Sequence, residues 1–218
     1  LGGALPDIDG RTGRPDVLIR VDQPSSVSKW SYLPCDVKSH DALEGTSKPR
    51  DWMVGSIDAP FHGDAIPTAL PGKPVKNDSL QLAHYWRMLE SLGWTPSSTK
   101  ATVPFAAIID KNRRVVWRDL GEALWKHEDP RSGVAVDRSA LQILDLEWEF
   151  RWSAVSSMLA GQPCTEPLWH TACGSCDWKD VCHDELDKKK HVSLIAGVTR
   201  DTTKRLASIG VTTIDQLA

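Results

Sequence analysis

The chain has 218 residues, a formal net charge of −3 and five cysteines. It can bury one core of ordinary size plus an appendage, and the weak negative charge excludes a general attraction to nucleic acid. No apolar stretch approaches the roughly 18 residues of a membrane helix, and no signal peptide opens the chain, so we expect a soluble, cytoplasmic protein without membrane partners. In that compartment, clustered cysteines are typically metal ligands rather than disulfides.

Two short apolar segments near the N-terminus, residues 17–21 and 32–38, predict β-strands. A polar segment with a proline and several serines separates them and predicts a turn. Cys35 lies within the second strand at a position that favours a buried face. We therefore interpret it as a small core residue rather than a ligand.

The ends of these strands carry the candidate active site. Asp36 and Lys38 are two residues apart, so we expect their side chains to point the same way and Val37 to point into the core. If the strands pair antiparallel, Asp16, which precedes the first strand, lies beside Asp36. Two carboxylates and the carbonyl oxygen of Val37 are hard ligands that suit Mg2+ or Mn2+ and leave positions open for water and phosphate.

The next region combines an irregular segment with a clear helix. Residues 39–75 contain His40 and five prolines and show little periodicity, so we expect a long loop with no more than one short helix. Residues 76–92 have a broad apolar face and stop at a glycine, which predicts a helix. Gln81 and Tyr85 share one face of it. Taken alone, these two side chains are better explained as ordinary interfacial residues.

Three further elements complete the expected core. Residues 102–109 and 113–117 predict two strands joined by a compact turn, and residues 138–160 predict a long amphipathic helix. Ten tryptophans is a high number, and at helical spacing they are more typical of a core than of a stacking platform for nucleotides. The apolar positions of the long helix that we expect in the core are Leu141, Leu144, Trp148, Trp152, Val155 and Leu159.

Four cysteines follow the long helix at metal-ligand spacing: Cys164, Cys173, Cys176 and Cys182. A C-x2-C pair places two thiols on one tight turn, and a further cysteine nearby can reach the same centre. The spacing fits zinc or an iron–sulfur cluster and does not separate them. Histidines at 170 and 183 are weaker substitute ligands, and three free buried cysteines are the structural alternative.

The ordered set of Pro15-Asp16, then Asp36-Val37-Lys38, then Gln81-x-x-x-Tyr85 resembles the PD-(D/E)XK nuclease signature. The Gly-Arg-Pro-Asp form of residues 13–16 is similar to the RecB-like branch. The cysteine pattern resembles the iron–sulfur members of that branch, which include CRISPR-associated RecB-type exonucleases and AddAB nuclease domains. The resemblance covers residues 13–183.

This resemblance implies an α/β fold with a restriction-endonuclease-like core, in which helices flank a central mixed sheet. It implies a Mg2+- or Mn2+-dependent deoxyribonuclease, an exonuclease on single-stranded DNA or DNA ends in repair, recombination or nucleic-acid defence. Asp16, Asp36 and the carbonyl of Val37 would hold the metal. Lys38 would orient the attacking water or steady the developing charge, and Gln81 and Tyr85 would position the substrate strand.

The resemblance also selects a [4Fe-4S] cluster on Cys173, Cys176 and Cys182, with zinc as the alternative. The remaining family ligand lies far upstream, so Cys164 is either a bystander or a local fourth ligand. The family carries a histidine or acid on a helix before Gly-Arg-Pro-Asp, and no histidine precedes Asp16 here. The chain begins with Leu1 and stops within a helical pattern, so we expect a fragment of a longer protein that could also carry a helicase or a further nuclease domain.

We expect three parts: a nuclease core at 1–163, a cysteine-rich segment at 164–187 and a small helical module at 188–218. The last part resembles a helix-hairpin-helix, whose backbone amides bind DNA phosphates without reading bases. A purely structural connector is equally open. Two other functions remain as alternatives, a catalytically incomplete DNA-binding or scaffold module and a phosphodiesterase acting on RNA.

Overall fold

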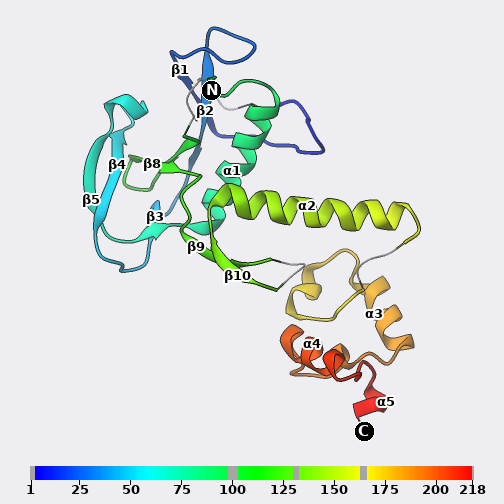
Figure 1. Ribbon diagram of the computed structural model, residues 1–218. Coiled ribbons are helices and arrows are strands. Elements are labelled where there is room, and N and C mark those ends of the chain that lie inside the picture. The colour runs from blue at the N-terminus through cyan, green and yellow to red at the C-terminus, as the bar shows by residue number, and fades with distance from the viewer. Residues whose placement is uncertain (1–2, 98–102, 130–132, 163–165, 218) are drawn as a thin grey trace. The chain divides into compact units, whose positions relative to one another are not determined.

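A computed structural model describes residues 3–97, 103–129, 133–162 and 166–217. The chain divides into two compact units, Leu1–Arg151 and Trp152–Ala218 (Figure 1). The first unit contains both strands and helices, which confirms the α/β class. None of the helices in the described ranges is long and apolar enough to cross a membrane. The restriction-endonuclease-like assignment and the three-part division stay predictions.

The first unit is built on a six-stranded mixed sheet. Its strands, in spatial order, are β1 (Val17–Val21), β2 (Ser31–Val37), β7 (Phe105–Ile109), β8 (Arg114–Asp119), β4 (Arg50–Ser56) and β5 (Ile66–Leu70). β2 and β7 are parallel, and the other neighbours are antiparallel. The four strands expected from the sequence are therefore confirmed, and the expected turn joins β7 to β8.

The pairing of β1 with β2 sets the geometry of the candidate site. The two strands are antiparallel, and Val17 lies opposite Cys35. Asp16 and Asp36 follow at the next level, one residue beyond this pair on each strand. Because directly opposed residues of an antiparallel pair point to the same face, the two carboxylates share one side of the sheet.

The expectation of a long loop at 39–75 is wrong. This segment contains β3 (Leu43–Glu44), β4, a short 3-10 helix η1 (His62–Asp64), β5 and β6 (Lys73–Pro74). β4 pairs with β8, a strand that is distant in sequence. The strand conformation of β4 depends on this tertiary pairing, which local periodicity cannot predict. Pro67 is tolerated because β5 is an edge strand of the sheet.

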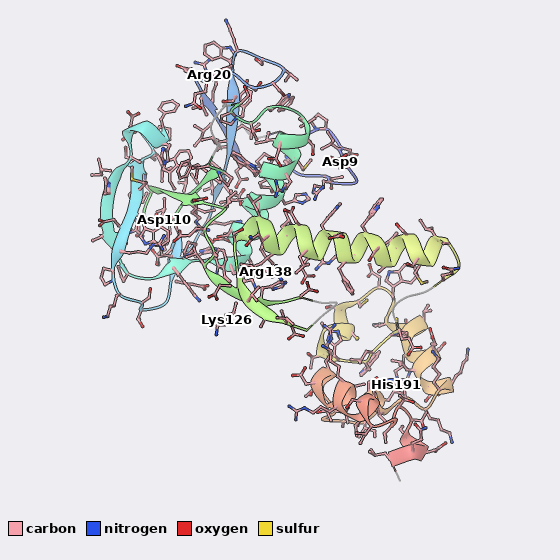
Figure 2. The ribbon with its side chains drawn as sticks, in the orientation of Figure 1. Asp9, Arg20, Asp110, Lys126, Arg138 and His191 are labelled. Atoms are coloured by element: carbon pink, nitrogen blue, oxygen red, sulfur yellow. The ribbon has the colours of Figure 1, made fainter. Side chains whose placement is uncertain are left out.

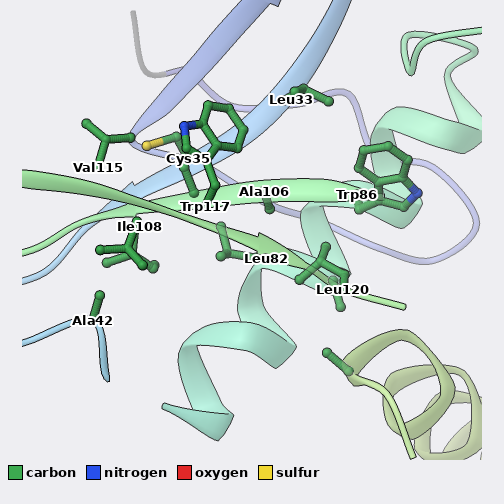
Figure 3. Packing of buried hydrophobic residues seen from close by; sticks show 14 of the residues in the cluster. Leu33, Cys35, Ala42, Leu82, Trp86, Ala106, Ile108, Val115, Trp117 and Leu120 are labelled. Carbon is green, nitrogen blue, oxygen red and sulfur yellow. The ribbon is translucent and has the colours of Figure 1, made fainter. Parts of the chain in front are cut away.

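Helix α1 (Lys76–Ser91) lies against β2 and β7 and confirms the expected helix. Leu82 of α1 and Ile108 of β7 are fully buried on the helix side of the strands, whereas Cys35 and Trp117 lie on the other side (Figure 3). Cys35 belongs to the main hydrophobic cluster, as expected. Both faces of the sheet therefore contribute to one core, which fixes β2 and α1 relative to each other.

Helix α2 (Ala140–Leu159) is present, but its expected core face is only partly correct. The buried residues lie in its first turn, where Ala140, Leu141 and Ile143 join the main cluster. Leu144 and Trp148 are half-buried. Trp152, Val155 and Leu159 are exposed, because the residues of the helix that pack on the main cluster lie at its start. A small hairpin of β9 (Trp125–Glu128) and β10 (Ala135–Arg138), not expected from the sequence, precedes the helix.

The second unit contains the end of α2, from Trp152 onward, and a set of short helices. The short helices are η2 (Thr171–Ser175), α3 (Lys179–Lys188), η3 (Val192–Leu194), α4 (Arg200–Ser208) and α5 (Ile214–Leu217). Its buried apolar side chains, within the described residues, are Leu186 and Val192. Gly197 and Gly210 have positive φ angles of 84° and 82°, so the expected breaks at glycines are present. His191, labelled in Figure 2, pairs with Thr213 in an isolated bridge.

Candidate active site

The segment before β1 is tied to the face of α1. Tyr85 donates its hydroxyl proton to the carbonyl oxygen of Arg14 at 3.3 Å, and His84 Nε2 donates to the carbonyl oxygen of Thr12 at 2.9 Å. A Cβ atom on Gly13 would lie 3.0 Å from the Tyr85 ring and closer still to another side chain of α1. Only glycine therefore allows this close approach, and the approach places Asp16 at the start of β1.

Asp16 and Asp36 form a pair of carboxyl groups with different environments. Asp16 is exposed, and its Oδ2 accepts a hydrogen bond from the backbone N–H of Val37 at 2.9 Å. This bond, followed by contacts with Asp36 and Lys38, lowers the pKa of Asp16. Asp36 is 3% exposed, and burial raises its pKa, with a further increase from Asp16 that opposes the effect of Lys38. The pair can therefore hold one carboxylate and one proton, or a cation.

The expected core position of Val37 is wrong, because its side chain is 50% exposed. Val37 is the last residue of β2 and points to the same face as Cys35. Cys35 lies opposite Val17, the first residue of β1, so β1 does not extend far enough to cover Val37. Its backbone N–H is nevertheless part of the site, through Asp16. The role of its carbonyl oxygen as a metal ligand stays a prediction.

Lys38 connects the carboxylates to α1. Its Nζ lies 2.6 Å from Asp36 Oδ2 and donates to Gln81 Oε1 at 2.7 Å. Burial alone would lower the pKa of Lys38, but the contact with Asp36 and the neighbouring carboxylates outweigh it and raise the pKa. Gln81 Nε2 in turn donates to the Tyr85 hydroxyl oxygen at 2.9 Å. The five candidate catalytic residues thus form one continuous set of contacts, called the polar chain below: Asp16, Asp36, Lys38, Gln81 and Tyr85.

Three titratable residues beside the polar chain were missed in the sequence. Asp78 precedes Gln81 by three residues, so helical periodicity alone places it on the same face. His40 follows Lys38 by two residues, so its side chain would be predicted to point the same way if the strand alternation continued beyond Val37. Arg118 is a buried cation in an apolar strand, and burial lowers its pKa to about 10. Its partners lie on distant segments, and no local pattern points to them.

The donor atoms at the Asp16–Asp36 pair are carboxylate oxygens, which fit Mg2+ or Mn2+. Burial and the neighbouring Asp16 raise the pKa of Asp36, while the Lys38 ammonium lies 2.6 Å from one of its oxygens and opposes this increase. Across the described ranges, no three His, Cys, Asp or Glu side chains are gathered closely enough to hold a metal ion. The metal role of this pair therefore stays a prediction.

The cysteines of the second unit lie on η2 and α3, which pack on each other. Cys173 is in η2 and its thiol donates to the carbonyl oxygen of Leu168 at 3.7 Å, while Cys176 follows η2 and Cys182 lies in α3. All three are free and at least partly exposed, whereas Cys164 lies outside the described residues. Thiols suit iron–sulfur clusters or zinc, but the described ones do not converge as a ligand set, so the cluster stays a prediction.

A cavity of about 420 Å³ lies on the sheet face opposite α1, where its lining includes Leu33, His62, Phe105 and Trp117. Burial lowers the pKa of His62, whose ring stacks on Phe105 at 4.1 Å between centroids. No member of the polar chain lines this cavity, so we place the chemistry on the α1 face.

Comparisons with protein-family models, curated proteins and solved structures give no match. The function must therefore be inferred from the geometry of the polar chain.

Proposed function

We propose that the chain is a metal-dependent deoxyribonuclease of the RecB-like PD-(D/E)XK type, which hydrolyses phosphodiester bonds in single-stranded DNA or at DNA ends. The observation that carries the proposal is the polar chain itself. Two strand ends and one helix, far apart in sequence, deliver two carboxylates, an amine, an amide and a phenol to one continuous set of contacts. A structural ion pair would require only Asp36 and Lys38.

The residues have distinct tasks in this proposal. Asp16 and Asp36, with the carbonyl oxygen of Val37, would hold Mg2+ or Mn2+, which when bound neutralises charge on the scissile phosphate and acidifies a water molecule. Lys38, kept protonated by its carboxylate neighbours, donates a hydrogen bond to the attacking water or to a phosphate oxygen. The ammonium thereby stabilises the negative charge that develops in the transition state.

Gln81 and Tyr85 act on the substrate side of the site. Gln81 accepts from Lys38 through its carbonyl oxygen and donates to Tyr85 through its amide nitrogen, so it fixes the position of both. Tyr85 is anchored on Arg14, whose own side chain is exposed two residues before Asp16. An exposed guanidinium there can contact a phosphate of the substrate strand and compensate for the negative net charge of the protein.

The competing proposal is a DNA-binding or scaffold module without catalysis. It draws support from the lack of a third acidic, histidine or cysteine ligand beside Asp16 and Asp36 in the part of the chain that the structure describes. Action on RNA is the other alternative, since nothing in the polar chain distinguishes a deoxyribose from a ribose.

A titration with Mg2+ and Mn2+ tests these proposals, using end-labelled single-stranded DNA, duplex DNA and RNA of one sequence. We expect metal-dependent cleavage of DNA, and a loss of at least about 100-fold in rate for Asp36→Asn and for Lys38→Ala. Asp51→Asn, an exposed aspartate in β4, is the matched control. Undiminished cleavage by either site variant refutes the assignment. Binding without cleavage favours the scaffold, and cleavage of RNA alone favours the phosphodiesterase.

A further inference from the structure

Asp78, in the first turn of α1, carries a buried carboxylate that the polar chain does not include. The residue is 6% exposed, and its Oδ2 atom has no hydrogen-bond partner. A buried carboxylate oxygen without such a partner is costly, because it has lost its hydration without a replacement. An atom of this kind calls for a specific explanation, and its charged neighbours supply one.

Two of these neighbours lie on the segment that follows β2. Lys38 Nζ is 4.0 Å from Asp78 Oδ1, and His40 Nε2 is 3.6 Å from Asp78 Oδ2. Asp78 therefore lies between the ammonium of the polar chain and an imidazole. The His40 side chain is about half exposed, so a substrate can reach the ring while the carboxylate behind it stays dry.

The hydrogen bonding of His40 fixes which nitrogen faces Asp78. Nδ1 lies 2.9 Å from the carbonyl oxygen of Asp41, which can only accept, so Nδ1 carries a proton. A second proton can then reside only on Nε2, on the side of the Asp78 carboxylate, and the charged ring and the anion attract each other. The separation of 3.6 Å is too long for a hydrogen bond, so that proton is available to another acceptor.

The position of His40 is held from the β7–β8 turn. Lys111 donates its backbone N–H to the carbonyl oxygen of His40 at 3.1 Å. Asp110, labelled in Figure 2, closes this turn by accepting from the backbone N–H of Asn112 at 2.9 Å and from the guanidinium of Arg114. Lys111 Nζ also pairs with Asp41 Oδ2 at 2.7 Å. The segment carrying His40 is thus fixed before any substrate arrives.

Arg118 holds the same segment to the start of α1. Its guanidinium donates to the carbonyl oxygen of Ala42 and to Ser79 Oγ, the latter at 2.8 Å. Ala42 follows His40 by two residues, and Ser79 follows Asp78 directly. This buried bridge therefore sets the His40–Asp78 distance from the core side.

We infer that His40 is a further catalytic residue, the general acid that protonates the leaving oxygen of the cleaved phosphodiester, and that Asp78 is its positioning residue. This inference rests on the proposed function. As the bond from the attacking water to phosphorus forms, the bond from phosphorus to the leaving sugar oxygen breaks, and that oxygen takes the Nε2 proton of His40. The proton lost by the water passes to solvent, from which Nε2 is protonated again.

A substrate whose leaving atom needs no proton tests this role. The probes are single-stranded DNA with one bridging phosphorothiolate at the cleaved bond, in separate 3′- and 5′-sulfur forms, and the same DNA with ordinary linkages. Sulfur leaves readily as a thiolate, because thiols are far more acidic than alcohols. The variants are His40→Gln and Asp78→Asn in the purified protein, with His127→Gln in β9 as the matched control and Lys38→Ala as the variant not expected to be rescued.

We expect His40→Gln to lose about 100-fold or more on the ordinary linkage, and to recover to within about 10-fold of wild type on one sulfur form. Asp78→Asn should lose less and recover on the same form, while Lys38→Ala should lose activity on every substrate. Equal losses of His40→Gln on oxygen and sulfur linkages, or no loss at all, overturn the inference even though the nuclease stands. If the wild type cleaves none of the substrates, the proposed function fails and the general acid fails with it.

Discussion

The two units of the chain differ in what holds their polar residues in place. In the α/β unit, a large cluster of buried side chains on both faces of the sheet fixes the strand ends and α1, and the polar chain follows from that scaffold. In the C-terminal unit, the described apolar core contains Leu186 and Val192, and the described cysteines lie at least partly exposed. Metal binding, which stays a prediction for this unit, is one way to stabilise a unit with a small apolar core.

The largest stability effect should come from the core of the α/β unit. Leu82→Ala removes a fully buried side chain between α1 and the sheet, so we expect a loss of about 2 to 5 kcal/mol in the free energy of unfolding. Leu159→Ala, at a position that is 85% exposed, is the matched control and should change it by less than about 0.5 kcal/mol. Urea unfolding followed by tryptophan fluorescence measures both, and similar losses would contradict the core that we describe.

In the C-terminal unit, Cys176→Ala should act through a bound metal rather than through packing. We expect anaerobically purified wild-type protein to be brown, with iron and sulfide, and the variant to lose both the colour and thermal stability. Ser175→Ala, next to the same cysteine, should keep both. About one zinc per chain without iron or sulfide would instead favour a zinc site that uses Cys164 as its local fourth ligand.

A smaller effect is expected on DNA binding by the same unit. Arg200 and Arg205 are exposed on α4, and replacing both with glutamine removes cations without disturbing the buried residues. If α4 binds phosphates, the slope of log affinity against log salt should become shallower by about 0.7 to 0.9 for each phosphate that α4 no longer neutralises. Lys126→Gln in β9, labelled in Figure 2, serves as the control. An unchanged slope leaves the structural connector as the explanation of residues 188–218.

The smallest effect concerns the charge of Asp36. Burial raises its pKa, so the folded protein binds this proton more tightly than the unfolded chain and loses stability as the pH rises from the ordinary aspartate range through the raised value. Asp36→Asn removes this loss. We expect the variant to match wild type below about pH 4 and to be the more stable protein above the window, with the gain reduced by the absence of the ion pair with Lys38.

Asp16→Asn should show the opposite sign. Its pKa is lowered, mainly by the Val37 N–H, so its contribution is present above the ordinary aspartate pKa and disappears as the pH falls through the lowered value. The free energies of unfolding of both variants, measured by urea titration from about pH 2 to about pH 8, test the pair together. A destabilising Asp36→Asn at neutral pH would mean that the ion pair with Lys38 outweighs the cost of burial.

The sequence predicted those parts of the fold in which local pattern and tertiary environment agree. Strand alternation located β2 and placed Asp36 and Lys38 on one side, and helical periodicity placed Gln81 near Tyr85. The sequence did not predict strands whose pairing partners are distant along the chain. β4 is an example, because its strand conformation depends on pairing with β8.

Periodicity in one segment also does not show how far the neighbouring strands or helices extend over it. This is why Val37 and the second half of α2 were expected in the core and are exposed. In the site, the contact between His40 and Asp78 depends on how Arg118 and the β7–β8 turn fix two separate segments. Spacing places Asp78 and His40 near the polar chain one at a time, but it does not predict their contact with each other.

The burial of Cys35 has a practical consequence for chemical labelling. Its side chain has no exposed surface, and burial raises the pKa of its thiol to about 12, so at neutral pH it is neither accessible nor a thiolate. Among the described cysteines, those that a maleimide can reach, Cys173, Cys176 and Cys182, all belong to the C-terminal unit. A fluorophore attached under mild conditions therefore reports on that unit without altering the strand that carries Asp36.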